Sequence, residues 1–134
     1  MKYITTLLGF LVLLPLSAYA QQGHPLDGIW LGDWGPVNGE RNQVVVELIW
    51  RDTALSGNIN PGFPDQVTIN KAMLDSANGW KVRLEGTGTD EAGNTFTAVL
   101  DGALNEEDLG YANRTISGTW TQAGTSGVFT LRRE

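Results

Sequence analysis

Apolar and polar residues alternate with a period of two along most of the chain after residue 20, and no window there keeps the 3.6-residue period of a helix. Gly, Asn, Asp or Pro interrupt the alternation at short intervals, which is typical of strands joined by turns. The pattern predicts eight strands. They cover residues 29–34, 43–50, 55–60, 66–74, 80–86, 95–104, 114–121 and 127–133.

The connections between these segments are short, for example residues 51–54 and 75–79, and none has room for a crossover helix. Strands connected in this way pair with their neighbours in sequence and run antiparallel. A row of such strands has two exposed edges unless the last strand pairs with the first. We therefore predict an all-β fold, an eight-stranded antiparallel up-and-down β-barrel, with a two-sheet β-sandwich as the alternative.

The alternation also predicts which side chains point into the barrel. In residues 43–50 the apolar side chains share one face and Glu47 lies on the other. Glycines recur on the inner faces, where a small barrel coils sharply or where an indole lies flat. These positions are Gly32, Gly57, Gly102 and Gly118.

The first part of the chain has the features of a cleavable signal peptide. Lys2 provides a positive charge, an apolar run follows, and residues 18–20 match the small-x-small pattern that a signal peptidase cleaves. The apolar run is shorter than the ~20 residues that span a bilayer. We predict cleavage after Ala20 and no insertion into a membrane afterwards. The predicted organisation is a signal peptide over residues 1–20, a flexible N-terminal leader over residues 21–28 and a single barrel domain over residues 29–134.

The chain is acidic and has no cysteine: 15 Asp and Glu residues stand against 9 Lys and Arg, a formal net charge of −6. A small exported domain without disulfides depends on its core alone, which favours a bacterial periplasm. An acidic surface repels phosphate backbones and anionic lipids, so nucleic acid is not expected as a partner. We expect a periplasmic or secreted monomer.

Few residues are available for catalysis or metal binding. The single histidine, His24, lies in the predicted leader, where a Ser-His-Asp triad would lack a rigid base. One histidine without cysteine cannot form a zinc site. The carboxylates near strands alternate onto the face opposite the apolar one, where ordinary exposed acids are expected; they are Asp27, Asp33, Glu47 and Asp101. We expect no enzymatic activity, no metal and no cofactor.

Tryptophans are the most distinctive side chains of the predicted domain. They are Trp30, Trp34, Trp50, Trp80 and Trp120. An eight-stranded barrel is wide enough either to be filled by side chains or to hold one small ligand. We favour indoles that fill the interior, with a pocket at one open end as the alternative. If there is a pocket, these five indoles are the candidate ligand-binding residues.

The two ends of the predicted domain resemble those of the calycin superfamily, which includes the lipocalins and fatty-acid-binding proteins. Residues 28–30 read Gly-Ile-Trp at the start of the first strand, and Arg132 and Arg133 close the last. In that superfamily a Gly-x-Trp near the first strand packs under an arginine from the last. The resemblance implies a calycin- or lipocalin-like barrel, and we do not carry ligand binding over from it.

This resemblance, combined with alternation along the last strand, predicts a latch that closes the barrel. Arg133 shares a face with the apolar residues of residues 127–133, so it points inward, whereas Arg132 reaches solvent. An inward guanidinium would stack by cation–π on Trp30 or Trp120. The predicted latch therefore consists of Gly28, Trp30, Trp120 and Arg133.

Most of the predicted domain is also similar to a small all-β domain of bacterial exported proteins, which occurs alone or ahead of secreted α/β-hydrolase domains. The similarity rests on "DGIWLGDW", "LSGNINPG", "VTINKAMLD" and "ISGTWTQAGTSGVFTLRR". It implies an accessory barrel without catalytic residues of its own. No hydrolase follows in this chain, so we expect any partner to be a separate protein.

Together these observations predict a non-catalytic exported barrel that binds a small apolar or amphipathic ligand or a periplasmic protein. One alternative is a periplasmic enzyme inhibitor or accessory subunit that acts through its N-terminal arm, residues 21–28. A purely structural module is the other alternative.

Overall fold

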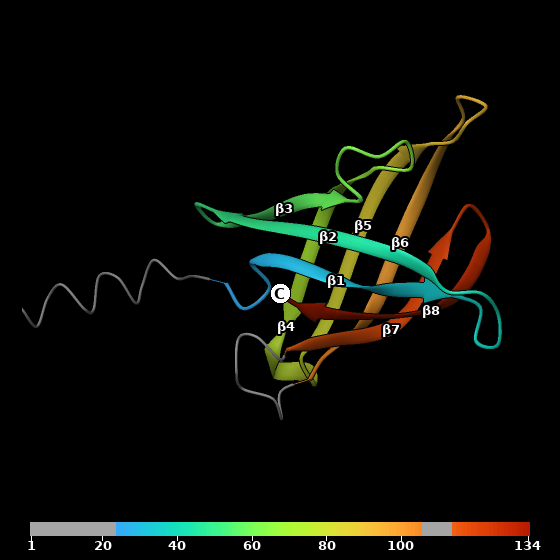
Figure 1. Ribbon diagram of the computed structural model, residues 1–134. Coiled ribbons are helices and arrows are strands. Elements are labelled where there is room, and N and C mark those ends of the chain that lie inside the picture. Colours follow the sequence, from blue (N-terminus) through green and yellow to red (C-terminus); the bar gives the residue numbers. More distant parts are fainter. Residues whose placement is uncertain (1–23, 106–113) are drawn as a thin grey trace, which may run out of the picture.

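The computed structural model describes residues 24–105 and 114–134, which form a closed barrel of eight antiparallel strands (Figure 1). Each strand pairs with its neighbours in sequence, so the predicted up-and-down barrel is confirmed and the sandwich is excluded. The strands are β1 (Gly28–Gly35), β2 (Asn42–Arg51), β3 (Ala54–Ile59), β4 (Val67–Asp75), β5 (Lys81–Thr89), β6 (Thr95–Leu104), β7 (Thr115–Gln122) and β8 (Thr125–Arg133), with a 3-10 turn, η1 (Ser76–Asn78), between β4 and β5.

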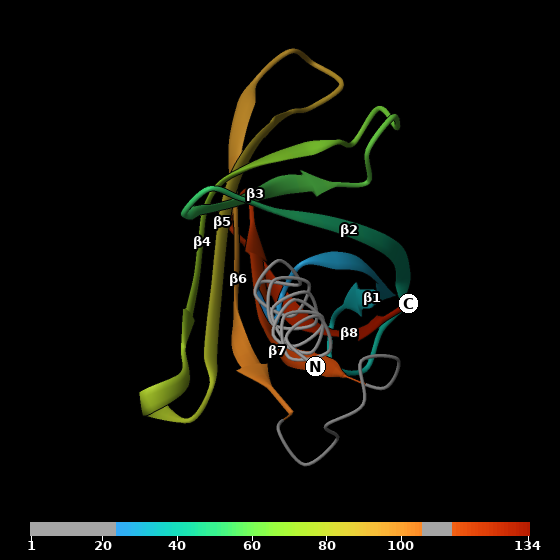
Figure 2. The same cartoon turned by 90° about the vertical axis from the view of Figure 1, so that its left-hand side faces the viewer.

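Pairing of β1 with β8 closes the barrel and removes both edges of the sheet. The register brings Trp30 opposite Arg133 and Gly35 opposite Val128. In Figure 1, β8 (dark red) lies beside β1 (blue), although most of the chain separates them in sequence. In Figure 2, β4, β5 and β6 form one long wall, and β1, β2, β7 and β8 curve around the opposite side.

Apolar side chains fill the interior of the barrel, as the alternation predicts. The largest of those that are fully buried are Trp30, Trp120 and Phe129. Among the described residues, no polar or charged residue is buried. The buried set is Leu26, Trp30, Val44, Val46, Leu48, Ile59, Val67, Ile69, Val82, Leu84, Ala98, Leu100, Leu104, Ile116, Trp120, Phe129 and Leu131.

Two inner-face glycines allow β6 and β7 to approach closely. Gly102 and Gly118 face each other in the register of these strands. A Cβ atom on Gly118 would overlap the carbonyl oxygen of Asp101, and one on Gly102 would overlap that of Ser117. The predicted role of inner glycines at sharp coils is therefore supported by the backbone contacts at this point of the wall.

Trp80 lies outside β5, although the alternation predicts it as the first residue of that strand. Gly79 and Trp80 have φ angles of 72° and 55°, so the chain turns through two left-handed residues before β5 begins at Lys81. A bulky residue with positive φ is strained. Packing of Trp80 against the core and a hydrogen bond from the Leu104 N–H to the Trp80 carbonyl, 2.9 Å, offset that strain.

Candidate functional site

The connections of an up-and-down barrel alternate between its two ends, and the two ends of this barrel differ. One end, which we call the mouth, carries the connections that follow β1, β3, β5 and β7. The other, which we call the latch end, carries residues 24–27 before β1, the turn that contains η1, and the chain end after β8.

At the latch end, the N-terminal segment packs into the barrel. Leu26 is 0% exposed and belongs to the core. The indole Nε1–H of Trp30 donates a hydrogen bond of 2.8 Å to the Leu26 carbonyl, and the backbone N–H of Trp50 donates one of 2.7 Å to Asp27 Oδ2. The described part of the predicted leader, residues 24–28, is therefore packed against the barrel and is not a free arm. Burial of the Leu26 side chain and the hydrogen bond of the Trp30 indole N–H hold it there.

Arg133 joins this segment to the last strand. Its Nε donates a hydrogen bond of 2.9 Å to the Asp27 carbonyl, and its guanidinium lies against Gly28, where a Cβ would come within 2.8 Å of Arg133 Nε. Gly28 has a φ of 132°, which favours glycine. Arg132 is exposed, as alternation predicts.

The structure therefore brings together three of the four predicted latch residues, Gly28, Trp30 and Arg133, and we keep the name latch for these three. Trp120 does not join them. It pairs with Gly127, near the start of β8, whereas Arg133 lies at the end of that strand. Alternation predicts that Trp120 points inward, but not at which height along the barrel it lies. Stacking of Arg133 on an indole stays a prediction.

Another aromatic contact lies at the latch end. The His24 and Trp50 rings have centroids 4.8 Å apart, and His24 Nδ1 accepts a hydrogen bond of 3.1 Å from the backbone N–H of Leu26. Burial lowers the pKa of His24 below its ordinary value, and the charge of Asp27 opposes that effect. This geometry assigns His24 to packing of the N-terminal segment.

Toward the mouth, the interior ends in a group of stacked rings. The indoles of Trp34 and Trp120 lie 4.8 Å apart at an interplanar angle of 14°, and Phe129 contacts Trp120 edge-on with centroids 6.1 Å apart. The Nε1–H of Trp120 donates a hydrogen bond of 3.1 Å to Gln122 Oε1 at the end of β7. This contact links the buried rings to the rim.

Gln122 also lines a hollow of about 220 Å³ at the rim, which we call the mouth hollow. Its walls come from the β3–β4 connection, from the β5–β6 connection and from the adjoining ends of the strands. They consist of Pro64, Asp65, Thr89, Asp90, Glu91, Phe96 and Gln122. A second hollow of about 400 Å³ shares Pro64 and Thr89 with it and is lined mainly by threonines and Gln66. The mouth therefore offers a concave surface with one aromatic ring and three carboxylates.

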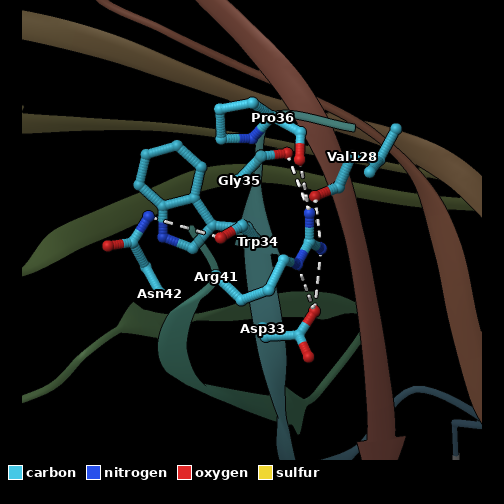
Figure 3. A network of polar contacts seen from close by, with 7 residues as sticks. All are labelled: Asp33, Trp34, Gly35, Pro36, Arg41, Asn42 and Val128. Atoms are coloured by element: carbon cyan, nitrogen blue, oxygen red, sulfur yellow. Dashed lines mark hydrogen bonds and ion pairs between the residues drawn. The ribbon is translucent and has the colours of Figure 1, made fainter. Parts of the chain in front are cut away.

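A guanidinium holds the β1–β8 seam together at the mouth (Figure 3). Arg41, which lies between β1 and β2, donates to Asp33 Oδ1 through Nε at 3.2 Å and Nη2 at 2.8 Å. It also donates to the carbonyls of Gly35 at 3.0 Å, Pro36 at 3.1 Å and Val128 at 3.0 Å. Sequence reasoning missed Arg41. It is a charged residue outside the alternating segments, and nothing in the local sequence indicates that its guanidinium donates five hydrogen bonds.

The five predicted indoles do not form a single pocket. Trp34 and Trp120 lie together at the mouth, whereas Trp50 contacts His24 at the latch end. Trp30 hydrogen-bonds Leu26 and Trp80 borders η1, so both belong to the latch end. Phe96 and Gln122, which line the mouth hollow, were not singled out as site residues from the sequence.

Residues 24–105 and 114–134 include no helix with the length and hydrophobicity that crossing a bilayer requires. The same residues include no group of three His, Cys, Asp or Glu side chains placed to share a metal ion.

Comparison of the chain with protein-family models, with curated proteins and with solved structures found no match. The fold therefore defines the class, a closed eight-stranded up-and-down β-barrel, and the two ends of the barrel hold the candidate functional residues.

Proposed function

We propose that this barrel is a non-catalytic, exported binding module that takes a small amphipathic ligand at its mouth. One observation carries the proposal: the mouth hollow of about 220 Å³ is lined by the Phe96 ring and by Gln122. Gln122 accepts the Nε1–H of Trp120, which stacks on Trp34. Ligand sites combine concavity, aromatic walls and a few polar groups in this way.

The filled interior favours binding at the rim over binding deep inside. Trp30 and Trp120 are at most 1% exposed, and they occupy the space that an open barrel would offer to an apolar chain. Three of the residues that line the mouth hollow are acidic, namely Asp65, Asp90 and Glu91. A neutral or positively charged polar group on the ligand therefore fits this site better than a carboxylate does.

The test follows tryptophan emission while a fatty acid, retinol and an alkylamine are titrated separately into residues 21–134. A saturable change is expected for retinol or the alkylamine, because a ligand beside Gln122 perturbs the hydrogen bond of Trp120. Phe96→Ala should weaken binding by roughly tenfold, since it removes one apolar wall. Phe63→Ala is the matched control: Phe63 is 62% exposed and lines a different hollow.

A flat titration with all three probes would reject the ligand-binding proposal and leave a purely structural module. An equal loss of affinity in the Phe63 and Phe96 variants would show that the ligand does not bind in the mouth hollow.

Export to the periplasm or beyond the cell is part of the same proposal, with cleavage after Ala20. The mass of the protein recovered from the periplasm or the medium tests it, since the mature chain should begin at Gln21. We also propose that the protein is related to small calycin-like exported barrels. The contact of Gly28 and Trp30 with the last strand near Arg133 supports this relationship. We also expect the purified protein to hydrolyse no ester, peptide or glycoside.

Action through a free N-terminal arm is less well supported than binding at the mouth. Leu26 is a core residue, so deletion of residues 21–28 would remove packing from the barrel as well as the arm. We therefore expect a separate protein partner to contact another surface of the barrel.

A further inference from the structure

The outer face of β1 exposes apolar side chains where a barrel wall normally carries polar ones. Ile29 and Leu31 are each 41% exposed. Val45 of β2 pairs with Leu31 and is half-buried on the same outer face. We call Ile29, Leu31 and Val45 the β1 outer surface. Adjacent exposed apolar side chains on one wall differ from scattered single ones and point to a contact surface.

Opposite charges flank this surface on its two sides. On the β8 side, Arg132 pairs with Leu31, and its side chain is exposed. On the β2 side, Glu47 pairs with Ile29, and its side chain also points outward. Arg132 therefore lies on β8, at the level of Leu31. Glu47 lies on β2, on the other side of β1, at the level of Ile29.

We propose that the β1 outer surface binds the same surface of a second copy of this chain. A two-fold axis that lies in the contact plane, crosses β1 between Ile29 and Leu31 and runs perpendicular to the line from Arg132 to Glu47 exchanges the positions of these two residues. Each Arg132 then meets Glu47 of the other copy, and the apolar side chains meet at the centre. A two-fold contact must be self-complementary, and the Arg132 and Glu47 charges are. The exposed Glu134, whose N–H bonds the Ile29 carbonyl, adds a negative charge on the β8 side that these pairs have to offset.

Two further features border the β1 outer surface. A hollow of about 310 Å³ adjoins Leu31 and Val45 and extends to Phe63, which is 62% exposed. Asp33, the next outward residue of β1, is paired with Arg41 at 2.8 Å, which offsets its charge at that edge. The chain is acidic overall, so two copies repel at long range. Two Arg–Glu pairs at the contact oppose that repulsion locally and fix the orientation.

Such a dimer is independent of ligand binding at the mouth and differs from the monomer expected from the sequence. Sedimentation velocity of residues 21–134, over a concentration series, tests it. We expect a reversible monomer–dimer equilibrium. Arg132→Glu alone and Glu47→Arg alone should each raise the dimer Kd by about tenfold or more, because like charges then face each other. The double variant R132E/E47R should recover the wild-type Kd.

Lys81→Glu is the matched control, since it reverses an exposed charge on β5, outside the proposed contact. It should leave the Kd unchanged, and circular dichroism should show that all variants keep the barrel. A chain that stays monomeric at millimolar concentration overturns the proposal. A dimer whose Kd ignores both single reversals overturns it as well. A monomer that instead sediments with phosphatidylcholine vesicles, and stops doing so in Leu31→Ser, would assign the surface to lipid and also overturn it.

Discussion

The fold shifts the ionisation of His24. Its ring packs on Trp50, and its Nδ1 accepts the Leu26 N–H, which requires the neutral imidazole. Burial lowers the pKa of His24 below its ordinary value of 6.5, with Asp27 acting in the opposite direction. The unfolded chain therefore binds more protons than the folded one over the interval between the two pKa values.

Stability should consequently fall on mild acidification. The contribution of neutral His24 is fully present above its unfolded pKa of 6.5 and is lost as the pH falls through the lower folded value. Urea unfolding at several pH values between about 5 and 7 measures this loss, where other side chains titrate little. The variant His24→Asn should show a flatter dependence. Parallel curves for the two proteins would contradict the prediction.

Single residues were the hardest features to predict from the sequence. Alternation placed Trp120 inside the barrel correctly, but it carries no information about height, so the assignment of Trp120 to the latch failed. Trp80 has a φ of 55° because the chain turns sharply after η1, and alternation alone favours extended backbone at that position. The role of Arg41 could not be predicted from the local sequence, because the Val128 carbonyl that it contacts lies 87 positions further along the chain.

At the scale of elements, guanidinium groups hold the β1–β8 seam at both of its ends. At the latch end Arg133 donates to the Asp27 carbonyl, and at the mouth Arg41 donates to the Val128 carbonyl. Each thereby joins a segment near the start of the barrel to its last strand. The seam is the pairing that brings together the two ends of the barrel sequence, so cross-links at its two ends oppose its opening.

Replacement of Arg41 should loosen the seam at one end only. Arg41→Gln removes several charge-assisted hydrogen bonds and should lower the free energy of unfolding by about 1–2 kcal/mol. Amide hydrogen exchange should accelerate near Gly35 and Val128, which pair in β1 and β8, and should change little near Trp30 and Arg133.

Arg83→Gln is the control for this prediction. Arg83 has two acidic partners, Glu85 at 3.0 Å and Asp101 at 2.9 Å, whereas Arg41 has one, and Arg83 lies on the open outer wall. Exposed ion pairs contribute little to stability. Equal effects of the two substitutions would show that Arg41 acts as an ordinary surface charge.

At the scale of the whole molecule, the closed barrel followed from the sequence because period-two alternation and short connections leave few topologies open. The packed state of residues 24–28 did not follow from it. Whether Leu26 is solvent-exposed or buried depends on the shape of the barrel end, which forms only when β8 meets β1. Features that depend on closure are therefore the ones that local patterns do not predict.

Removal of the last three residues should weaken the entire barrel. A chain that ends at Leu131 loses the Arg133 side-chain bond to Asp27 and two backbone bonds, from the Arg133 N–H to the Arg114 carbonyl and from the Glu134 N–H to the Ile29 carbonyl, each 2.9 Å. The expected loss is about 3 kcal/mol in the free energy of unfolding. Alanine at all three positions keeps the backbone bonds and should cost less. A truncated chain that melts like the full one would contradict the role given to closure.

The pairing of Trp30 with Arg133 also determines when the barrel can form during synthesis. A ribosome releases the N-terminal strand first, so β1 has to wait for nearly all of the remaining chain before its second neighbour exists. During that interval β1 keeps one unpaired edge and Trp30 lacks its final surroundings, a state that is prone to aggregation. Such long-range pairing is slow to form. The complete set of strand pairs can therefore form only after the last strand has left the ribosome.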